Sequence, residues 1–308
     1  MKKVLIAILL LGLLPHASAD YIHWVDFRLS APVLRSALEL DMASQGGEQP
    51  LDWIDILALA AAWRGGTGVT VADTQRAAQA LRGDTPPERL PGMAGRYFSY
   101  YREAYGAALG GLAGHFAIRR TDPQTGEAEW IPAYGLKAFS PIAAGYPWSH
   151  YPDFGAQRSY GYARPHLGND ILGALGTPIC AVEGGTVEAL GWNRYGGWRI
   201  GIRSDDRKRY YYYAHLRKDA PYAEGLAVGQ RVQAGDVIGF MGRTGYSAQE
   251  NVNNIETVHL HFGLQLIFDE SQKECDSEIW VDVYDLVEFL SQHRSSVENR
   301  DGQWVRIY

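Results

Sequence analysis

Four of the nine histidines in this 308-residue chain, together with one aspartate, lie in three short segments. They are His166 and Asp170, then His215, then His259 and His261. Two imidazoles and one carboxylate can hold a zinc ion and leave one coordination position open, as catalytic zinc requires. The two remaining imidazoles can then transfer protons beside the metal. The residue types alone therefore indicate a catalytic metal site.

The spacing within each segment predicts how these side chains point. His166 and Asp170 are four residues apart, which places them on one side of either a strand or a helix. The neighbouring Pro165 and Gly168 favour an extended segment over a helix. His259 and His261 are two residues apart, so on a strand both point to the same face.

The elements that must position these residues are expected to be antiparallel strands. Between residues 161 and 270, short apolar runs alternate with glycines at close spacing, and no helical segment separates them. Residues 271–308 return to helical periodicity over 279–293, which predicts a C-terminal helical tail.

The part of the chain that precedes the β region has a different pattern. Residues 20–114 predict a small all-helical domain. Residues 115–160 are aromatic and rich in proline and glycine, which favours a linker or an ordered loop. The expected fold class is α+β, and the helices are expected over residues 31–42, 52–63, 71–81 and, more weakly, 97–112.

The N-terminal residues are typical of an export signal. Lys2 and Lys3 precede an apolar run over residues 4–14, and residues 17–19 form a small-x-small cleavage site. We therefore expect a signal peptide over residues 1–19 and a mature protein in the periplasm, the cell wall or the extracellular space. The apolar run is short for a transmembrane helix, with an uncleaved anchor as the alternative.

The net charge and the two cysteines give only weak indications about binding partners and disulfide pairing. Removal of Lys2 and Lys3 leaves 27 of the 29 basic residues against 35 acidic ones, a formal charge of −8. This balance favours neither nucleic acid nor an anionic membrane as a partner. Cys180 and Cys275 would form a loop of about 95 residues if they paired after export, and two unpaired thiols are the alternative.

The motifs of the β region occur in an order that resembles a known family. They are His-x-Gly-x-Asp, Gly-Thr-Pro-Ile, Gly-Gly-Thr-Val, Tyr-Ala-His-Leu, Val-Gly-Gln-Arg-Val, Ala-Gly-Asp-Val-Ile-Gly, Thr-Gly and His-Leu-His-Phe. In this order they are similar to the lysostaphin-type zinc metallopeptidases, also called the β-lytic or LytM-like family. The resemblance covers residues 161–268, about a third of the chain.

The resemblance assigns a role to each of the five residues. It implies that His166, Asp170 and His261 bind one zinc ion, with water or substrate at the fourth position. It implies that His215 and His259 serve proton transfer and oxyanion stabilisation, without saying which residue does which. The histidines outside the motifs are expected to be core or surface residues. These are His23, His115, His150 and His293.

Three further residues are expected to line a substrate groove. Tyr213 lies two residues before His215 and would share its strand face. Tyr195 precedes a Gly-Gly turn that resembles a family loop beside the groove. Asn254 lies in a loop, residues 246–257, that is longer than is common in the family.

Two single positions also depart from the family pattern and bear on substrate preference. Val258 stands where proline is common, and Gly263 stands where glutamate is common. Together with the longer loop, these departures prevent the substrate preference of the best-known members from being carried over.

The leading hypothesis for function is a secreted zinc endopeptidase that cuts peptidoglycan stems or cross-bridges. A non-catalytic member that binds wall material or activates a hydrolase is one alternative, and an endopeptidase with a protein substrate is another. Regulation is a further hypothesis. The aromatic segment before His166 would cover the groove and make the protein latent, with His150 or Asp153 approaching the metal.

Overall fold

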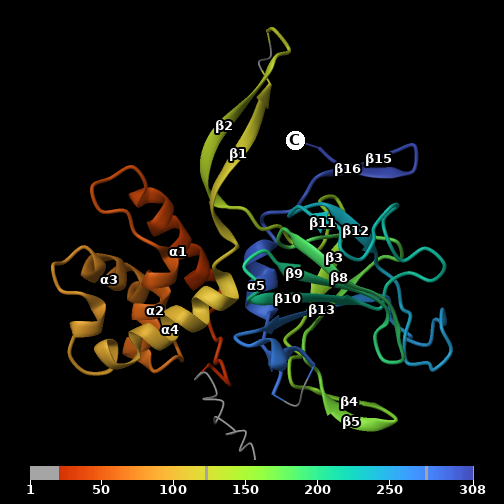
Figure 1. The fold of residues 1–308 in the computed structure, drawn as a ribbon, viewed down its shortest axis with the longest axis horizontal. Coiled ribbons are helices and arrows are strands. Elements are labelled where there is room, and N and C mark those ends of the chain that lie inside the picture. Colours follow the sequence, from red (N-terminus) through yellow and green to blue (C-terminus); the bar gives the residue numbers. More distant parts are fainter. Residues whose placement is uncertain (1–20, 122–123, 275–276, 308) are drawn as a thin grey trace, which may run out of the picture.

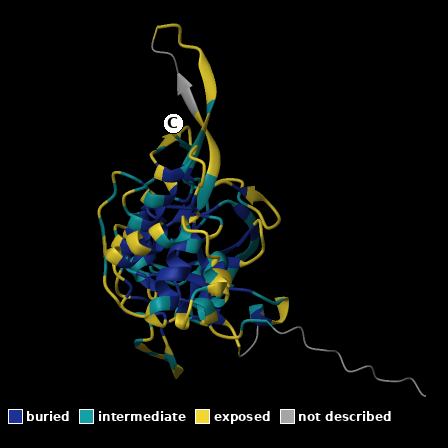
Figure 2. Cartoon of the chain, turned by 90° about the vertical axis from the view of Figure 1, so that its left-hand side faces the viewer, coloured by how far each residue is buried: buried dark blue, intermediate teal, exposed yellow. Residues whose placement is uncertain are grey.

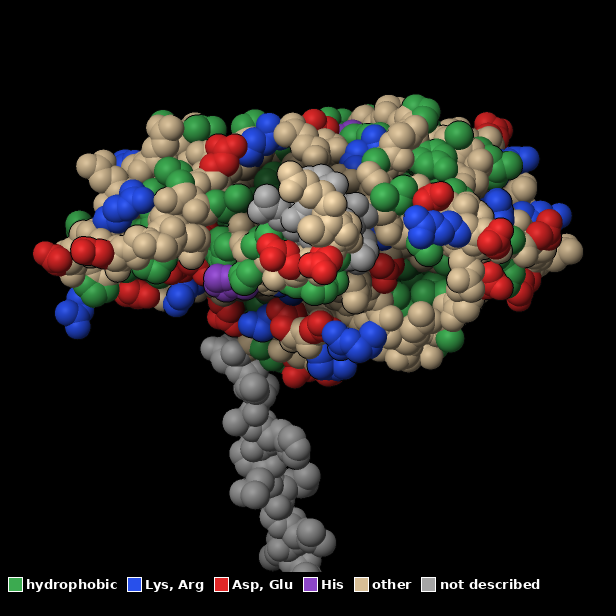
Figure 3. All heavy atoms as spheres, turned by 90° about the horizontal axis from the view of Figure 1, so that it is seen from above, with side chains coloured by type: hydrophobic (Ala, Val, Ile, Leu, Met, Phe, Trp, Pro, Cys, Tyr) green, Lys and Arg blue, Asp and Glu red, His purple; other side chains and the backbone are tan. Residues whose placement is uncertain are grey.

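The computed structural model describes residues 21–121, 124–274 and 277–307. The expected signal peptide and Cys275 lie outside these residues. Within the described part, no helix has the length and apolar character needed to span a membrane. Basic and acidic side chains are interspersed over the face seen from above (Figure 3).

The N-terminal part is helical, as predicted. Its elements are α1 (Ala31–Ser44), α2 (Trp53–Arg64), α3 (Val71–Leu81), the 3-10 turn η1 (Pro87–Arg89) and α4 (Met93–Leu109). The Asp52 side chain caps α2 by accepting from the Ile54 N–H, and Gly65 ends this helix in the left-handed region, with φ of 64°. A reciprocal capping box between Thr70 and Asp73 begins α3.

A long β-hairpin begins the stretch that was expected to be a linker or ordered loop. Strands β1 (Ala113–Thr121) and β2 (Ala128–Leu136) pair in antiparallel register. The hairpin projects from the body of the protein, and much of its outer part is exposed (Figures 1 and 2). The linker prediction for residues 115–160 is therefore wrong for this hairpin. It is also wrong for two short strands near the end of the same stretch, β3 (Trp148–His150) and β4 (Gln157–Tyr160).

The C-terminal half is built on a large antiparallel sheet, as predicted. Its strand order is β11-β8-β9-β10-β13-β6-β3, and β14 pairs with one end of β13. The strands are β6 (Asn169–Gly173), β8 (Gly185–Asn193), β9 (Gly197–Ser204), β10 (Arg209–Ala214), β11 (Arg231–Val232), β13 (His259–Leu266) and β14 (Ile279–Trp280). Two smaller pairs flank it: β4 with β5 (Tyr162–Pro165), and β7 (Pro178–Cys180) with β12 (Val237–Phe240).

The C-terminal tail is only partly helical. A 3-10 turn η2 (Glu270–Glu274) precedes β14, and the helix α5 covers only Tyr284–Leu290. The chain then forms a hairpin from β15 (Val297–Arg300) and β16 (Gln303–Arg306). The helix expected over 279–293 is shorter because Ile279 and Trp280 pair with β13 instead. Tertiary pairing here overrides the local helical pattern.

The helical part and the sheet share one hydrophobic core. Helix α5 lies between them (Figure 1). The Ala31 N–H at the start of α1 donates to Asp285 at 2.9 Å, and the Trp53 ring stacks on Phe289 with centroids 6.1 Å apart. On the other side of the boundary, Arg209 of β10 donates to the Ala107 carbonyl of α4 at 2.7 Å. The two parts therefore hold each other in place.

Candidate metal centre and groove

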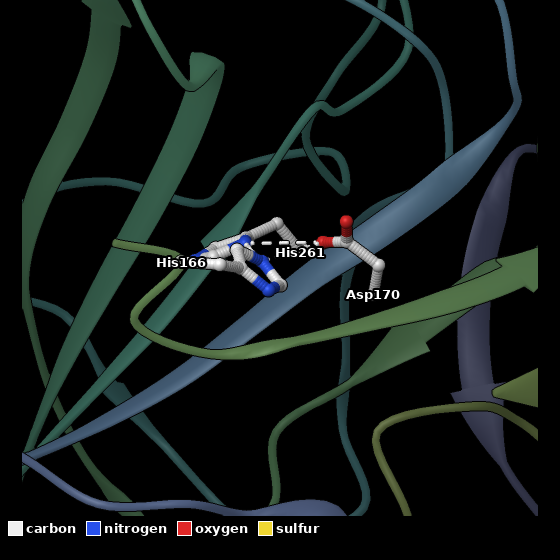
Figure 4. A group of neighbouring side chains, drawn as sticks. All are labelled: His166, Asp170 and His261. Carbon is white, nitrogen blue, oxygen red and sulfur yellow. Dashed lines mark hydrogen bonds and ion pairs between the residues drawn. The ribbon is translucent and has the colours of Figure 1, made fainter. Parts of the chain in front are cut away.

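Three donor atoms from the predicted ligand set meet at one end of β6 and β13 (Figure 4). His166 Nε2 lies 2.8 Å from His261 Nδ1 and 3.0 Å from Asp170 Oδ1. His261 Nδ1 lies 3.2 Å from the same carboxylate oxygen. The pairing of His261 with Asp170 in the β6–β13 register brings these two side chains together, and His166 approaches from the segment before β6.

This donor set fits a zinc ion. A tetrahedral zinc with bonds of about 2.0–2.1 Å holds its ligand atoms roughly 3.4 Å apart. The three observed separations, 2.8, 3.0 and 3.2 Å, are shorter than this by about 0.2–0.6 Å. Two imidazole nitrogens and one carboxylate oxygen are also the ligand types that catalytic zinc uses. The three residues therefore meet the requirements of a three-ligand metal centre.

Asp153 and Arg158 form an outer layer around these ligands. Asp153 Oδ2 lies 3.2 Å from His166 Nδ1, on the side of the ring that faces away from the other ligands. Arg158 donates to Asp153 at 2.8 Å and to Asp170 Oδ2 at 3.0 Å. Such partners orient metal ligands and fix the imidazole tautomer. Asp153 therefore contacts the ligand His166 but contributes no donor atom to the metal centre.

Burial and neighbouring charges set the protonation of these groups. Burial lowers the pKa of His166, but its contacts with Asp153 and Asp170 outweigh burial and raise this pKa to about 9. Burial opposes ionisation of Asp170, yet hydrogen bonds from His166 and His261 hold its pKa well below the ordinary value. Burial lowers the pKa of His261, although Asp170 acts in the opposite direction. At neutral pH, Asp170 is therefore ionised and His261 is neutral. His166 would lose its proton when a metal binds.

His215 and His259 lie next to the ligands, with their ring centroids 4.7 Å apart. Each Nδ1 donates to a backbone carbonyl at 2.9 Å, that of Thr244 for His215 and that of Thr257 for His259. The two Nε2 atoms stay available to a substrate, and His259 Nε2 lies 3.6 Å from Asp170 Oδ1. Burial and the neighbouring imidazoles lower the pKa of His215 well below its ordinary value.

Glycines allow two close approaches that the site requires. A Cβ on Gly168 would lie 2.7 Å from the His261 ring, so a side chain there would displace a ligand. A Cβ on Gly197 would lie 2.4 Å from the Thr244 backbone, and its φ of 65° is in the left-handed region. The Thr244 carbonyl accepts a hydrogen bond from His215 Nδ1, so the Gly-Gly turn packs against the residue that orients His215.

A cavity of about 360 Å³ opens in front of the donor set. Its volume is in the range of ordinary ligand sites. It is lined by all three candidate ligands, by His215, and by aromatic and basic side chains that include Tyr195, Tyr210, Tyr212 and Trp280. A second cavity of about 390 Å³ shares Arg158, Asp170 and Tyr246 with it and reaches His259 and Asn254. Tyr195 and Asn254 therefore line the groove.

The prediction for Tyr213 is wrong. This side chain is fully buried, and its hydroxyl accepts from the Val182 N–H at 3.0 Å. Tyr212 pairs with Gly263, two residues from His261, and so shares the face of the ligands. His215 has φ of 61°, which interrupts the strand alternation and brings its ring to the groove face. Tyr212 therefore takes the place that was expected for Tyr213.

Several groove residues were not predicted from the sequence. Trp280 explains the departure at Gly263, because a Cβ there would lie 2.8 Å from its ring. Strand parity counted from His261 would have found Tyr210 and Tyr212, whereas the contribution of Trp280 depends on tertiary pairing. The residues missed are Arg158, Arg164, Arg199, Tyr210, Tyr212 and Trp280.

The remaining histidines and the described cysteine lie outside the donor set. His150 Nδ1 lies 2.7 Å from Asn169 Oδ1, so it supports β6 and does not approach the ligands. His293 donates to the Ala138 carbonyl, and His23 is exposed. Cys180 is a buried free thiol.

An antiparallel sheet that presents two histidines and one aspartate in a groove, with two further histidines beside them, defines a metallohydrolase type of site. Residues 164–277 match the model of peptidase family M23. This segment is therefore an M23 peptidase domain, in agreement with the lysostaphin-type resemblance.

Curated relatives share this domain. The chain is 40% identical over 130 residues to the L-Ala–D-Glu endopeptidase of Bacillus subtilis, covering 42% of this chain and 38% of that protein. It is 37% identical over 98 residues to lysostaphin of Staphylococcus simulans, covering 32% of this chain and 17% of that protein. The chain thus spans well under half the length of both relatives.

One solved structure resembles more of the chain. A presumed glycyl-glycine endopeptidase lytM from Ruminococcus gnavus has a TM-score of 0.50 and 26% sequence identity. The match covers 87% of this chain and 91% of that protein, so the likeness extends well beyond the peptidase domain.

Proposed function

We propose that this protein is an exported, zinc-dependent endopeptidase that hydrolyses peptide bonds of peptidoglycan stems or cross-bridges. The observation that carries the proposal is the complete set of five residues gathered at one groove. His166, Asp170 and His261 form the donor set, and His215 and His259 stand beside it. Named endopeptidase relatives of the same domain support the reaction class.

The reaction follows from what each group can do. His166, Asp170 and His261 would hold the metal, with Asp153 keeping the His166 ring in position. When bound, zinc polarises the scissile carbonyl and lowers the pKa of a bound water to about 7. His215 and His259 present their Nε2 atoms to the groove, where one ring in its neutral form accepts a proton and the other, in its protonated form, donates a hydrogen bond to the developing oxyanion. The aromatic groove walls hold the peptide in place.

The names of the relatives support peptidoglycan as the substrate class but differ in the bond. One is named for L-Ala–D-Glu, another is the glycyl-glycine endopeptidase ALE-1 of Staphylococcus capitis, and a third is the peptidoglycan DD-endopeptidase ShyC of Vibrio cholerae. The long loop that carries Asn254 and the Trp280 side chain over Gly263 shape this groove.

The test compares purified protein with and without zinc on isolated peptidoglycan. We expect new amino termini with the zinc-loaded protein and none after chelation. His261→Ala should abolish the release, whereas the exposed control His23→Ala should retain it. Activity on protein chains alone would favour the protein-substrate alternative. Wall binding without any cleavage by the zinc-loaded protein would favour a non-catalytic role and would overturn the proposal.

A further inference from the structure

Two arginines in the groove have no carboxylate partner among the described residues. Arg164 of β5 and Arg199 of β9 both line the cavity in front of the metal centre. The other two cations of this cavity are held by acidic side chains. Arg158 pairs with Asp153 and Asp170, and Lys273 pairs with Glu188.

Each of these two arginines has a buried donor atom that is not used. Arg164 Nη1 and Arg199 Nε are both shielded from solvent, and neither has a hydrogen-bond partner among the described residues. A buried donor without a partner costs about 1–3 kcal/mol, and more when it belongs to a charged group. Native structures leave few such groups, and those they leave call for an explanation. An anionic ligand would supply it.

Arg164 is held firmly in the groove wall. Its guanidinium lies 4.5 Å from the centroid of Tyr195 and 5.4 Å from that of Tyr246. These cation–π contacts hold the guanidinium beside the groove. Arg164 also lies two residues before the ligand His166, so its place relative to the metal is set by a short segment.

Arg199 lies on the ligand-bearing face of the sheet. It is two residues from Gly201, which pairs with Tyr212, and Tyr212 pairs with Gly263 in the strand of the ligand His261. Two strand spacings separate β9 from β13, which places Arg199 roughly 10 Å across the sheet from His261. A peptide residue extends about 3.5 Å. A group one or two residues from the scissile bond can therefore reach Arg199.

The charges that face Arg199 are few. Its guanidinium lies beside Tyr210. Burial is the main cause that raises the pKa of the Tyr210 phenol to about 12, and the positive charge of Arg199 acts in the opposite direction. The acidic side chains that line this cavity are Asp170 and Glu278. Asp170 is held by Arg158, and Glu278 accepts from the Trp280 indole N–H at 2.8 Å. Arg164 and Arg199 therefore remain the two cations of this cavity that no acidic side chain among the described residues holds.

We propose that Arg164 and Arg199 form a carboxylate-binding subsite, so that the preferred substrate peptide carries a free carboxylate within one or two residues of the scissile bond. The inference rests on the proposed function, because it specifies the substrate class of the same groove. Arginine suits this role because its planar fork matches a carboxylate with two parallel hydrogen bonds. A peptide amidated at the same carbon would lose both the charge and one acceptor oxygen.

The test uses pairs of otherwise identical wall peptides that carry either a carboxylate or a carboxamide at that position. With the zinc-loaded protein, we expect kcat/KM to be about 10- to 100-fold higher for the carboxylate peptide. Arg199→Gln and Arg164→Gln should each lower kcat/KM for the carboxylate peptide and leave the carboxamide peptide almost unaffected. Arg231→Gln is the matched control, since Arg231 is exposed and pairs with Asp205.

A binding measurement separates this inference from the proposed function. Non-cleavable analogues of the same peptide pair are titrated into each variant, with thermal unfolding used to show that every variant is folded. Tighter binding of the carboxylate analogue, lost in Arg199→Gln, supports the subsite even if no peptide is cleaved. Equal cleavage and equal binding of both peptides by the wild-type protein would overturn the subsite while leaving the endopeptidase proposal intact.

Discussion

At the residue scale, the site depends on a few side chains that act through one another. Asp170 receives contacts from His166, His261 and Arg158, and Asp153 holds the far nitrogen of His166. The five residues of the motif could be predicted from their types and spacing. The latency hypothesis placed His150 or Asp153 near the metal, whereas the contact of Asp153 with the second ring nitrogen of His166 depends on how the chain folds back before β6.

We expect Asp153→Asn to weaken zinc binding by about 10- to 100-fold, because outer partners of metal-bound histidines have effects of this size. The amide cannot supply the negative charge that faces His166 Nδ1. Competition with a chromophoric chelator measures the affinity. The exposed Asp84→Asn serves as the control. An unchanged affinity in Asp153→Asn would show that the His166 ring is positioned by other contacts.

At the element scale, strand alternation explains both a success and an error. His259 and His261 share a face of β13, as their spacing predicted. The same reasoning misplaced Tyr213, because the positive φ of His215 changes the alternation just after β10 ends. The residue type alone does not predict this conformation, since positive φ is uncommon for residues other than glycine.

The β4–β5 hairpin forms one wall of the groove. The ring of Tyr160 stacks on Tyr246 with centroids 5.1 Å apart, and both Tyr160 and Tyr162 contact Tyr195. These contacts join the β4–β5 hairpin to the loops that carry Tyr195 and Tyr246. The latency hypothesis placed the segment before His166 over the groove, and the structure shows that it supplies Arg158 and Arg164 to the groove lining.

Tyr160→Ala should raise KM for a wall peptide several-fold and leave zinc affinity unchanged, because it removes the ring that packs on the groove residues Tyr195 and Tyr246 and contacts no ligand. Steady-state kinetics on a defined peptide, together with zinc titration, test this. Tyr97→Ala, in the helical part, is the control. If the substitution instead increased activity on intact peptidoglycan, the hairpin would act as a cover over the groove.

At the scale of the whole molecule, a buried ionic network joins the helical part to the sheet. Arg209 donates to Glu183 at 2.8 Å and to the Ala107 carbonyl at the end of α4, and Tyr211 donates to the same carboxylate at 2.7 Å. The helices could be predicted from periodicity and caps. The shared core could not, since it depends on contacts between residues from about 100 to about 250 positions apart.

Arg209→Met should lower the free energy of unfolding by about 3–5 kcal/mol, because it leaves the Glu183 carboxylate buried without its partner. Urea denaturation measures the loss. The double variant Arg209→Met with Glu183→Gln should recover much of the loss. Since the two parts share a core, tryptophan fluorescence and circular dichroism should report a single transition. Two separate transitions would contradict the shared core.

The most direct test of the endopeptidase account is product analysis by mass spectrometry on defined muropeptides. The metal-stripped protein is assayed alone, after addition of zinc, and as the zinc-loaded His215→Ala variant. The account predicts two product fragments, separated by one hydrolysed peptide bond, only for the zinc-loaded wild-type protein. Intact muropeptides with the zinc-loaded protein, or equal cleavage after chelation, would contradict it.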